Sequence, residues 1–280
     1  VFFVHIYLQY ATIHIDRKEN MSKGIDDIDN HWYIDEQFDS RGIDNEISQL
    51  EFNNPYVFSQ KENTKADITF VGDSVLDCKY YTGTGLGTVD YVIEQLPKHI
   101  KDKAPERVND ISLDGYTIYD CIKDVSKVHG DTVVVSAGGN DLLAKLPMLK
   151  VSKDINVVMN IMNNELNKLS LAYETLLHEC KKSGRNFLLL TTYDGNLAFN
   201  PQRFAGVDEI AKAILSMWNE RLYRLANDQQ RRNNAQNFDV LELRNFMATT
   251  CFYNEIEPNK RGAKRIAKNI NKYLFDNGVW

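Results

Sequence analysis

Short runs of apolar and β-branched residues alternate along most of the chain with longer stretches of helical spacing. From residue 66 onward the runs are DITFV, VNDISL, TVVVSA, NFLLLTT and FDVLEL, at 67–71, 108–113, 132–137, 186–192 and 238–243. Uninterrupted apolar runs of this length are typical of strands that are buried on both faces. The pattern therefore predicts a parallel sheet of five strands.

The stretches between and after these runs repeat apolar residues every three or four positions, as amphipathic helices do. They cover residues 88–100, 116–128, 155–182, 207–232 and 260–275. In the fourth stretch one stripe is formed by Val207, Ile210, Ile214, Trp218, Leu222 and Leu225. Strands that alternate with helices predict an α/β protein, a three-layer α/β/α sandwich.

Residues 1–65 lack this alternation. They are polar, dotted with aromatic residues and weakly periodic, which predicts a partly disordered N-terminal extension beside a domain at 66–280. The opening residues 1–15 lack the basic region of a signal peptide. We therefore expect a cytoplasmic protein, and a secreted one only if this segment is a truncated signal.

The composition narrows the function classes. With 280 residues, 43% of them hydrophobic, the chain is long enough for a sizeable core and is typical of a soluble globular protein. Its net charge of -6 comes from interspersed acidic and basic residues, so it has no basic stripe for a nucleic acid. No apolar run approaches the roughly 20 residues of a membrane span. The four cysteines form no C-x-x-C pair, so their spacing indicates neither a metal site nor a disulfide framework.

Candidate chemistry lies where the strands end, because ligands of an open parallel sheet bind beyond the carboxyl ends of its strands. Ser74 follows the first run, at an expected strand-to-helix turn where helix N–H groups would face an anion. Gly115 follows the second run, and Gly139 and Asn140 follow the third. A hydroxyl beside several N–H donors is what acyl transfer requires at the developing oxyanion.

Each of these residues also has an ordinary structural interpretation. Ser74 by itself is more often a helix N-cap, Gly115 a turn residue, and Asn140 part of a left-handed turn. Their places after successive strands of one sheet favour the functional interpretation.

Four blocks in this order resemble the SGNH (GDSL) hydrolases: Gly72-Asp73-Ser74, then Gly115, then Gly138-Gly139-Asn140-Asp141, then Pro258-Asn259-x-x-Gly262. The similarity runs from about residue 66 to residue 274. It implies a flavodoxin-like fold and ester or acyl hydrolysis with no metal or cofactor. It also implies that Ser74 is the nucleophile, with an oxyanion hole made by the N–H groups of Ser74 and Gly115 and the side chain of Asn140.

The last block departs from the family pattern, which reads Asp-x-x-His-Pro. Here Asn254 stands in place of the aspartate and Glu257 in place of the histidine. An asparagine amide can donate to a glutamate, so an orienting bond can survive with its direction reversed. A glutamate is a weaker base than histidine by about two pKa units unless burial raises its pKa.

Three interpretations of this exchange remain open. In the first, Glu257 is the general base. In the second, it is a surface acid whose negative charge interacts favourably with the positive N-terminal end of the following helix. Alternatively another carboxylate serves as the base, with Asp73, Asp194 and Glu255 as candidates.

The sequence predicts a serine ester hydrolase that forms an acyl-enzyme on Ser74 and acts on a small-molecule or glycan ester, such as an acetylated glycan. Asp73, Gly139 and Tyr193 are expected to bind the substrate. The alternative is a catalytically impaired relative that binds a ligand without turning it over. The oligomeric state is not indicated.

Overall fold

The computed structural model describes residues 67–150, 154–197, 208–232 and 236–280, and the account below concerns these residues. The chain divides into two units, Val1–Val57 and Phe58–Trp280, and all of the described residues belong to the second. The predicted extension at 1–65 lies outside the described residues and stays a prediction.

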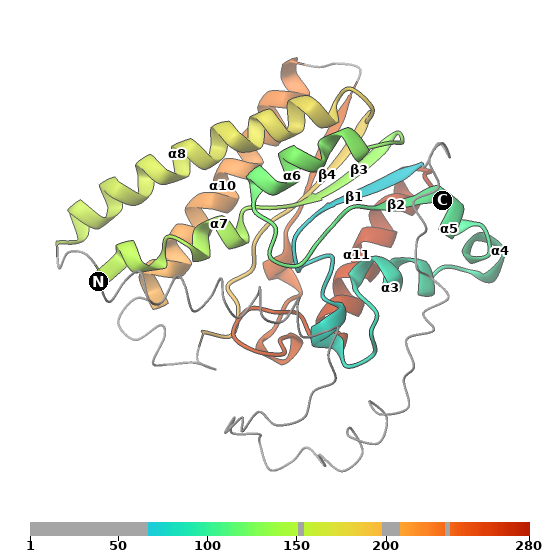
Figure 1. Cartoon of the computed structure of the whole chain (residues 1–280), viewed down its shortest axis with the longest axis horizontal. Helices are drawn as coiled ribbons and strands as arrows, with labels where there is room; N and C mark the ends of the chain where they lie inside the picture. Colours follow the sequence, from blue (N-terminus) through green and yellow to red (C-terminus); the bar gives the residue numbers. More distant parts are fainter. Residues whose placement is uncertain (1–66, 151–153, 198–207, 233–235) are drawn as a thin grey trace, which may run out of the picture. The chain divides into compact units, whose positions relative to one another are not determined.

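A parallel sheet of five strands forms the centre of the described domain (Figure 1). The strands are β1 (Ile68–Gly72), β2 (Val108–Asp110), β3 (Thr132–Ser136), β4 (Asn186–Leu190) and β5 (Asn237–Leu241), in the spatial order β2-β1-β3-β4-β5. All five predicted strands are confirmed. β2 is shorter than the predicted run 108–113, because its pairing with β1 ends at Asp110.

Each predicted amphipathic stretch contains a helix. The helices are α3 (Thr88–Glu94), α4 (Lys98–Lys101), α5 (Ala104–Arg107), α6 (Ile118–Asp124), α7 (Gly139–Leu143), α8 (Ile155–Cys180), α10 (Asp208–Arg232) and α11 (Lys260–Asp276). Two short helices, α5 and α7, were not predicted. Short 3-10 turns include η2 (Lys79–Thr82) and η4 (Leu146–Lys150). The predicted helix at 88–100 is divided into α3 and α4, because Pro97 has no N–H to continue the hydrogen-bond ladder.

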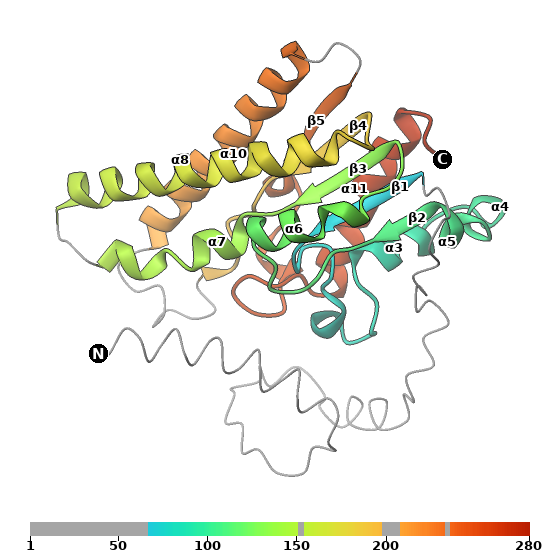
Figure 2. The ribbon, with the colours of Figure 1, turned by 45° about the horizontal axis from the view of Figure 1, so that its top comes forward.

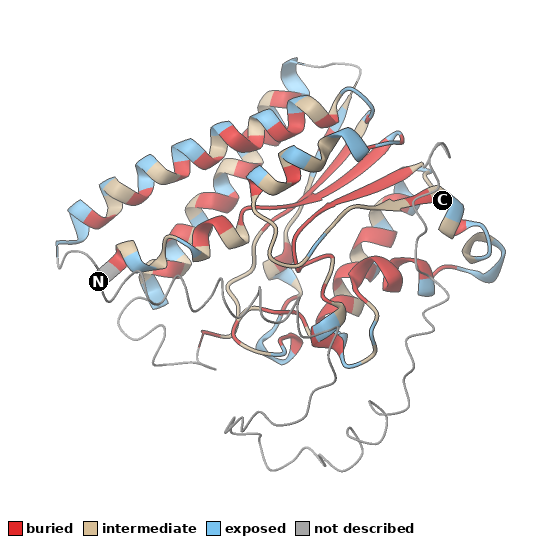
Figure 3. Ribbon diagram, in the orientation of Figure 1, coloured by how far each residue is buried: buried red, intermediate tan, exposed pale blue. Residues whose placement is uncertain are grey.

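Two hydrophobic clusters lie on opposite faces of the sheet, since neighbouring side chains of a strand point to opposite sides. Val71, Val133 and Leu189 pack under α6, α8 and α10, whereas Phe70 and Val134 pack under α3 and α11. The three central strands β1, β3 and β4 are buried almost throughout, whereas the edge strands β2 and β5 are partly exposed (Figure 3). The three-layer α/β/α sandwich is therefore confirmed.

The strand order places a topological switch point between β1 and β3. The chain leaves β1 toward α3 on one face and leaves β3 toward α7 and α8 on the other face. Loops that diverge from adjacent strands leave a crevice at the carboxyl edge, where ligands bind in sheets of this kind. In two views α7 and the N-terminal parts of α8 and α10 reach past this edge (Figures 1 and 2).

Within the described residues, no helix combines the length and the apolar character needed to span a bilayer.

Candidate active site

Ser74 lies immediately beyond the carboxyl end of β1 and is 7% exposed. The strand ends at Gly72, where an added Cβ atom would lie 2.2 Å from the carbonyl oxygen of Ser136, so only glycine fits there. The Asp73 carbonyl then accepts from the N–H groups of Leu76 and Asp77, both at 3.0 Å, which closes one tight turn around the serine.

The expected helix directly after Ser74 is absent. The turn leads into η2, and α3 begins only at Thr88. A helix dipole therefore does not act on Ser74, and any oxyanion stabilisation must come from individual N–H groups. The tight turn supplies one of these, because the Ser74 N–H donates to no group among the described residues.

Gly115 lies in the loop after β2, which is fixed to the end of β1 by a 3.0 Å bond from the Leu113 N–H to the Gly72 carbonyl. Gly115 has a φ of 83°, a left-handed conformation that glycine adopts without strain. Within the described part of the chain its N–H also donates to no partner. This loop therefore has a second N–H that is not used by the fold.

Asn140 stands in the first turn of α7. Its side-chain nitrogen donates to the Tyr116 carbonyl at 2.9 Å, which uses one of its two N–H groups and fixes the orientation of the amide. The second N–H stays available to a ligand. The backbone before it turns through Gly138, which has a φ of 108° and packs directly against the Trp218 ring.

Asp73 is buried beneath the serine turn. Its Oδ1 accepts from the Ser136 hydroxyl at 2.9 Å and from the Val75 N–H at 3.1 Å. Burial, which disfavours the charged form, raises the pKa of Asp73 to about 7. Because these bonds join two strands and the turn, Asp73 holds the position of Ser74, and Ser136 is a supporting residue that the sequence motifs did not indicate.

Glu257 lies in the loop before α11, which is closed by an antiparallel bridge between Phe252 and Pro258. Its carbonyl accepts from the Tyr253 N–H at 2.8 Å. Asn254 acts inside this loop, where its Oδ1 accepts from the N–H groups of Ile256 at 2.9 Å and Glu257 at 2.8 Å.

This geometry corrects the role expected for Asn254. Among the described hydrogen bonds, its side chain contacts the backbone of Glu257 and not the carboxylate. The reason is the short loop, in which an asparagine oxygen naturally caps the N–H groups two and three residues ahead. Asn254 orients Glu257 through the main chain.

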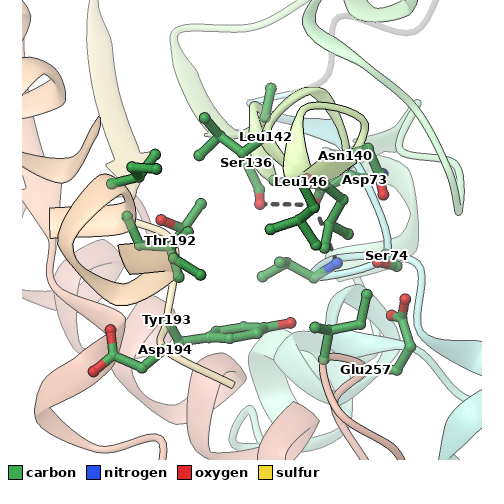
Figure 4. Close-up of a pocket in the computed structure, with 18 of the residues that line it drawn as sticks. Asp73, Ser74, Ser136, Asn140, Leu142, Leu146, Thr192, Tyr193, Asp194 and Glu257 are labelled. Carbon is green, nitrogen blue, oxygen red and sulfur yellow. Dashed lines mark hydrogen bonds between the residues drawn. The ribbon is translucent and has the colours of Figure 1, made fainter. Parts of the chain in front are cut away.

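The Glu257 carboxylate extends into the interior toward Ser74 (Figure 4). The residue is 7% exposed, so its interpretation as a surface acid before α11 is wrong. The pKa of Glu257 is raised to about 8, chiefly by burial and also by the nearby Asp114, while its interaction with Ser74 lowers it. Its Oε2 has no hydrogen-bond partner among the described residues. The site therefore has a serine hydroxyl paired with a carboxylate of unusually high proton affinity.

The other candidate bases do not have this relationship with Ser74. Asp73 is bonded to Ser136 and Val75, and the Asp194 carboxylate points away from Ser74 (Figure 4). Glu255 acts on Glu257 as a nearby like charge that raises its pKa, and its carbonyl accepts from the Asn196 N–H at 2.7 Å.

A pocket of about 870 Å³, including its open mouth, adjoins these groups. Asp73, Ser74, Gly139, Asn140 and Glu257 all line it, together with Tyr193. The Tyr193 ring packs edge-on against Phe252 with centroids 4.9 Å apart, and its burial raises the pKa of the phenol well above the usual value. The structure therefore brings together most of the residues predicted for the site. Gly115 lies in the adjoining loop and is not part of the pocket wall.

The remaining pocket wall is apolar and was not predicted from sequence motifs. It comes mainly from α7, η4, α8 and α10, with side chains that include Leu142, Leu146, Leu149, Met162 and Ile214. Of the six histidines, the three in the described residues are His99, His129 and His178, and none of them lines the pocket. The described residues also contain no cluster of histidine, cysteine and acidic side chains that could hold a metal ion.

Solved structures similar to this chain share its fold at low sequence identity. They include a lipase from a goat rumen metagenome (TM-score 0.53, 19% identity, covering 74% of this chain and 96% of that one). An acetylxylan esterase from Geobacillus stearothermophilus has a TM-score of 0.51 and 14% identity, covering 76% of this chain and 96% of that one. A GDSL-like lipase from Parabacteroides merdae has a TM-score of 0.50 and 14% identity, covering 78% and 98%.

These neighbours are esterases and lipases, and the five-stranded parallel sheet with helices on both faces matches the SGNH hydrolase fold. No protein-family model and no curated protein sequence matches the chain.

Proposed function

We propose that this protein is a serine hydrolase of carboxylic esters, with Ser74 as nucleophile and Glu257 as general base. The observation that carries the proposal is the approach of the buried Glu257 carboxylate to Ser74 in one pocket (Figure 4), beside N–H groups that the described fold leaves unused. The fold shared with esterases and lipases supports the same reaction class.

In the first half-reaction the Glu257 carboxylate accepts the Ser74 hydroxyl proton while the serine oxygen bonds to the ester carbonyl carbon. The carbonyl oxygen becomes an oxyanion, which the N–H groups of Ser74 and Gly115 and the spare N–H of Asn140 stabilise. The intermediate then expels the alcohol, which takes the proton from Glu257. The acyl group remains on Ser74.

In the second half-reaction water attacks the acyl carbon, and Glu257 accepts its proton. The intermediate breaks the bond to the Ser74 oxygen, which recovers that proton, and the carboxylic acid is released. Glu257 becomes neutral on accepting a proton, whereas a histidine becomes cationic and attracts the oxyanion. We therefore expect slower turnover than a histidine-dependent enzyme achieves with the same donors.

One of the similar solved structures bears on the presence of a glutamate instead of a histidine beside the serine. For the acetylxylan esterase, a variant with a histidine replaced by alanine is described as a catalytic mutant. In this chain the carboxylate of Glu257 occupies the position beside the serine, and its raised pKa brings its basicity into the range of an imidazole.

Labelling with a fluorophosphonate, followed by intact-mass analysis, tests the proposal directly because the reagent modifies only an activated serine. At pH 9 we expect one label on the wild-type protein, and none on Ser74→Ala or Glu257→Gln. Glu255→Gln is the matched control, since it removes a buried carboxyl two positions away and should still be labelled. An unlabelled wild-type protein would contradict the proposal.

A ligand-binding module without turnover is the second candidate. It is favoured by the Glu257 pKa of about 8, which leaves most of the carboxyl protonated at neutral pH. In that case fluorophosphonate labelling fails even at pH 9, while an ester or its product acid still raises the melting temperature.

A further inference from the structure

The pocket beside Ser74 has an apolar wall that extends away from the reacting groups. Its side chains come from α7 and η4 on one side and from the N-terminal parts of α8 and α10 on the other, with Ile256 and Leu197 from the adjoining loops. Figure 4 shows the open space bounded by Leu142, Thr192 and Tyr193, with Ser74 at its edge. A group attached to Ser74 therefore has a continuous apolar space beside it.

Few polar atoms face this wall. Ser136 donates to Asp73 at 2.9 Å, and the Thr192 hydroxyl donates to Asn219 at 2.8 Å. The Asp194 carboxylate is directed away from the open space (Figure 4), and its Oδ1 has no hydrogen-bond partner among the described residues. A sugar or other polyol lying along the apolar wall would leave most of its hydroxyl groups without partners, which is costly, whereas an aliphatic chain requires none.

We propose that this pocket binds the acyl chain of the ester, and that the protein prefers straight chains of roughly six to ten carbons over acetyl groups. The inference rests on the proposed ester hydrolysis and adds its substrate class. The apolar wall is formed by side chains of four helical elements and two loops, and an acetyl group on Ser74 leaves nearly all of this wall unused.

The first experiment measures kcat/KM for a series of p-nitrophenyl esters from acetate to laurate at one pH. The hydrolysis rate measured with the Ser74→Ala protein is subtracted for each ester. Burying one methylene favours binding by about fourfold, so we expect kcat/KM to rise at least about 100-fold from acetate to octanoate. A series in which acetate is the best substrate would overturn the proposal and leave ester hydrolysis intact.

Ala211 offers a variant that narrows the pocket. It lies in α10, is 5% exposed and lines the pocket, so Ala211→Leu adds three carbon atoms to the apolar space. We expect the ratio of kcat/KM for decanoate to kcat/KM for acetate to fall by about tenfold or more. Ala213→Leu is the matched control, because this exposed residue of the same helix does not line the pocket. Equal effects of the two variants on decanoate would overturn the proposal.

A binding measurement separates failure of this inference from failure of the proposed reaction. Decanoic acid is titrated into the wild-type protein, Ala211→Leu and Ala213→Leu by calorimetry. If no ester is hydrolysed but decanoic acid binds and Ala211→Leu alone abolishes binding, the acyl pocket stands and the hydrolase proposal falls. If neither turnover nor binding is found, both are wrong.

Discussion

The side chains of Ser74 and Glu257 approach each other in the interior of the protein, one from the turn after β1 and the other from the loop before α11, and both line the same pocket (Figure 4). The surroundings of this pair are unusual, because the nearby charges that act on Glu257 are those of Asp114, Asp73 and Glu255. Burial and these like charges together favour the neutral acid. Glu257 can therefore accept a proton from Ser74 only in those molecules in which its carboxyl group is ionised.

The pH dependence of activity follows from this arrangement. With a Glu257 pKa of about 8, we expect kcat/KM to rise with pH as a single ionisation, with half of the maximum at about pH 8 and a plateau above. The measurement is an ester hydrolysis profile from pH 5 to 10. The Ser74→Ala protein, measured in parallel, gives the background from hydroxide. A half-maximum near pH 4.5, or near the pH 6.5 typical of histidine, would contradict the assignment.

The same pKa predicts how Glu257 affects stability. Its folded-state pKa lies above the ordinary glutamate value of 4.5, so between pH 4.5 and 8 the folded state holds a proton that the unfolded state has lost. The contribution of Glu257 to the free energy of unfolding is therefore full below pH 4.5. It declines as the pH rises from 4.5 to 8, by up to about 1.4 kcal/mol per pH unit.

Glu257→Gln removes this titration while keeping the shape of the side chain. We expect its melting temperature to match that of the wild-type protein near pH 5 and to exceed it at pH 8 to 9, although the variant is inactive. Differential scanning calorimetry at these pH values measures the difference. Glu255→Gln serves as a comparison. If the wild-type protein is as stable as the variant at pH 9, ionisation of Glu257 does not lower the free energy of unfolding, which contradicts the prediction.

The sheet and most of the helices could be predicted because their signals are local. The apolar runs and the stripe through Ile214, Trp218 and Leu222 each depend on a few neighbouring residues, and all three of these side chains are buried. The absence of a helix directly after Ser74 was not predicted, since the expectation rested on the usual strand-to-helix turn, whereas the chain here forms η2 and a glycine-containing loop before α3.

The residues of the site could be predicted, but their interactions could not. Asn254 and Glu257 were identified by their places before Pro258, yet the bond between them runs to the main chain because the loop is short. The burial of Glu257 depends on how this loop meets the ends of β1 and β4, which is a tertiary contact. The apolar pocket likewise depends on helices that extend past the sheet, and their stripes resemble ordinary core positions.

Introducing the Asp-His pair of the SGNH hydrolase pattern into the last loop tests the proposed role of Glu257. In the double variant Asn254→Asp/Glu257→His, one carboxylate oxygen of the aspartate can still accept from the Ile256 and Glu257 main-chain N–H groups. The other oxygen can then accept from the imidazole. We expect the half-maximum of the pH profile to move from about pH 8 to about 6.5 or 7.

The single variant Glu257→His is the control for this experiment, since it supplies the imidazole without a carboxylate to orient it. We expect it to be less active than the double variant by about tenfold or more, as general-base catalysis is worth about 10² to 10⁴ in rate. Both variants are measured with the ester that the wild-type protein hydrolyses best. An inactive, folded double variant would show that the loop does not present residue 257 to Ser74 as the structure describes.

Gly138 turns the backbone that leads into Gly139 and Asn140, and its replacement should lower the stability of the protein. The residue has a φ of 108°, and an added Cβ atom would lie 2.6 Å from the buried Trp218 ring. Gly138→Ala combines backbone strain with overpacking, so we expect a loss of about 3 kcal/mol in the free energy of unfolding.

Gly278→Ala is the control, because Gly278 has a φ of 66° with no atom within 4 Å of the added Cβ. It should lose only about 1 kcal/mol, from strain alone. Urea denaturation of both variants measures the difference, and equal losses would show that the contact with Trp218 does not constrain the turn that carries Gly139 and Asn140.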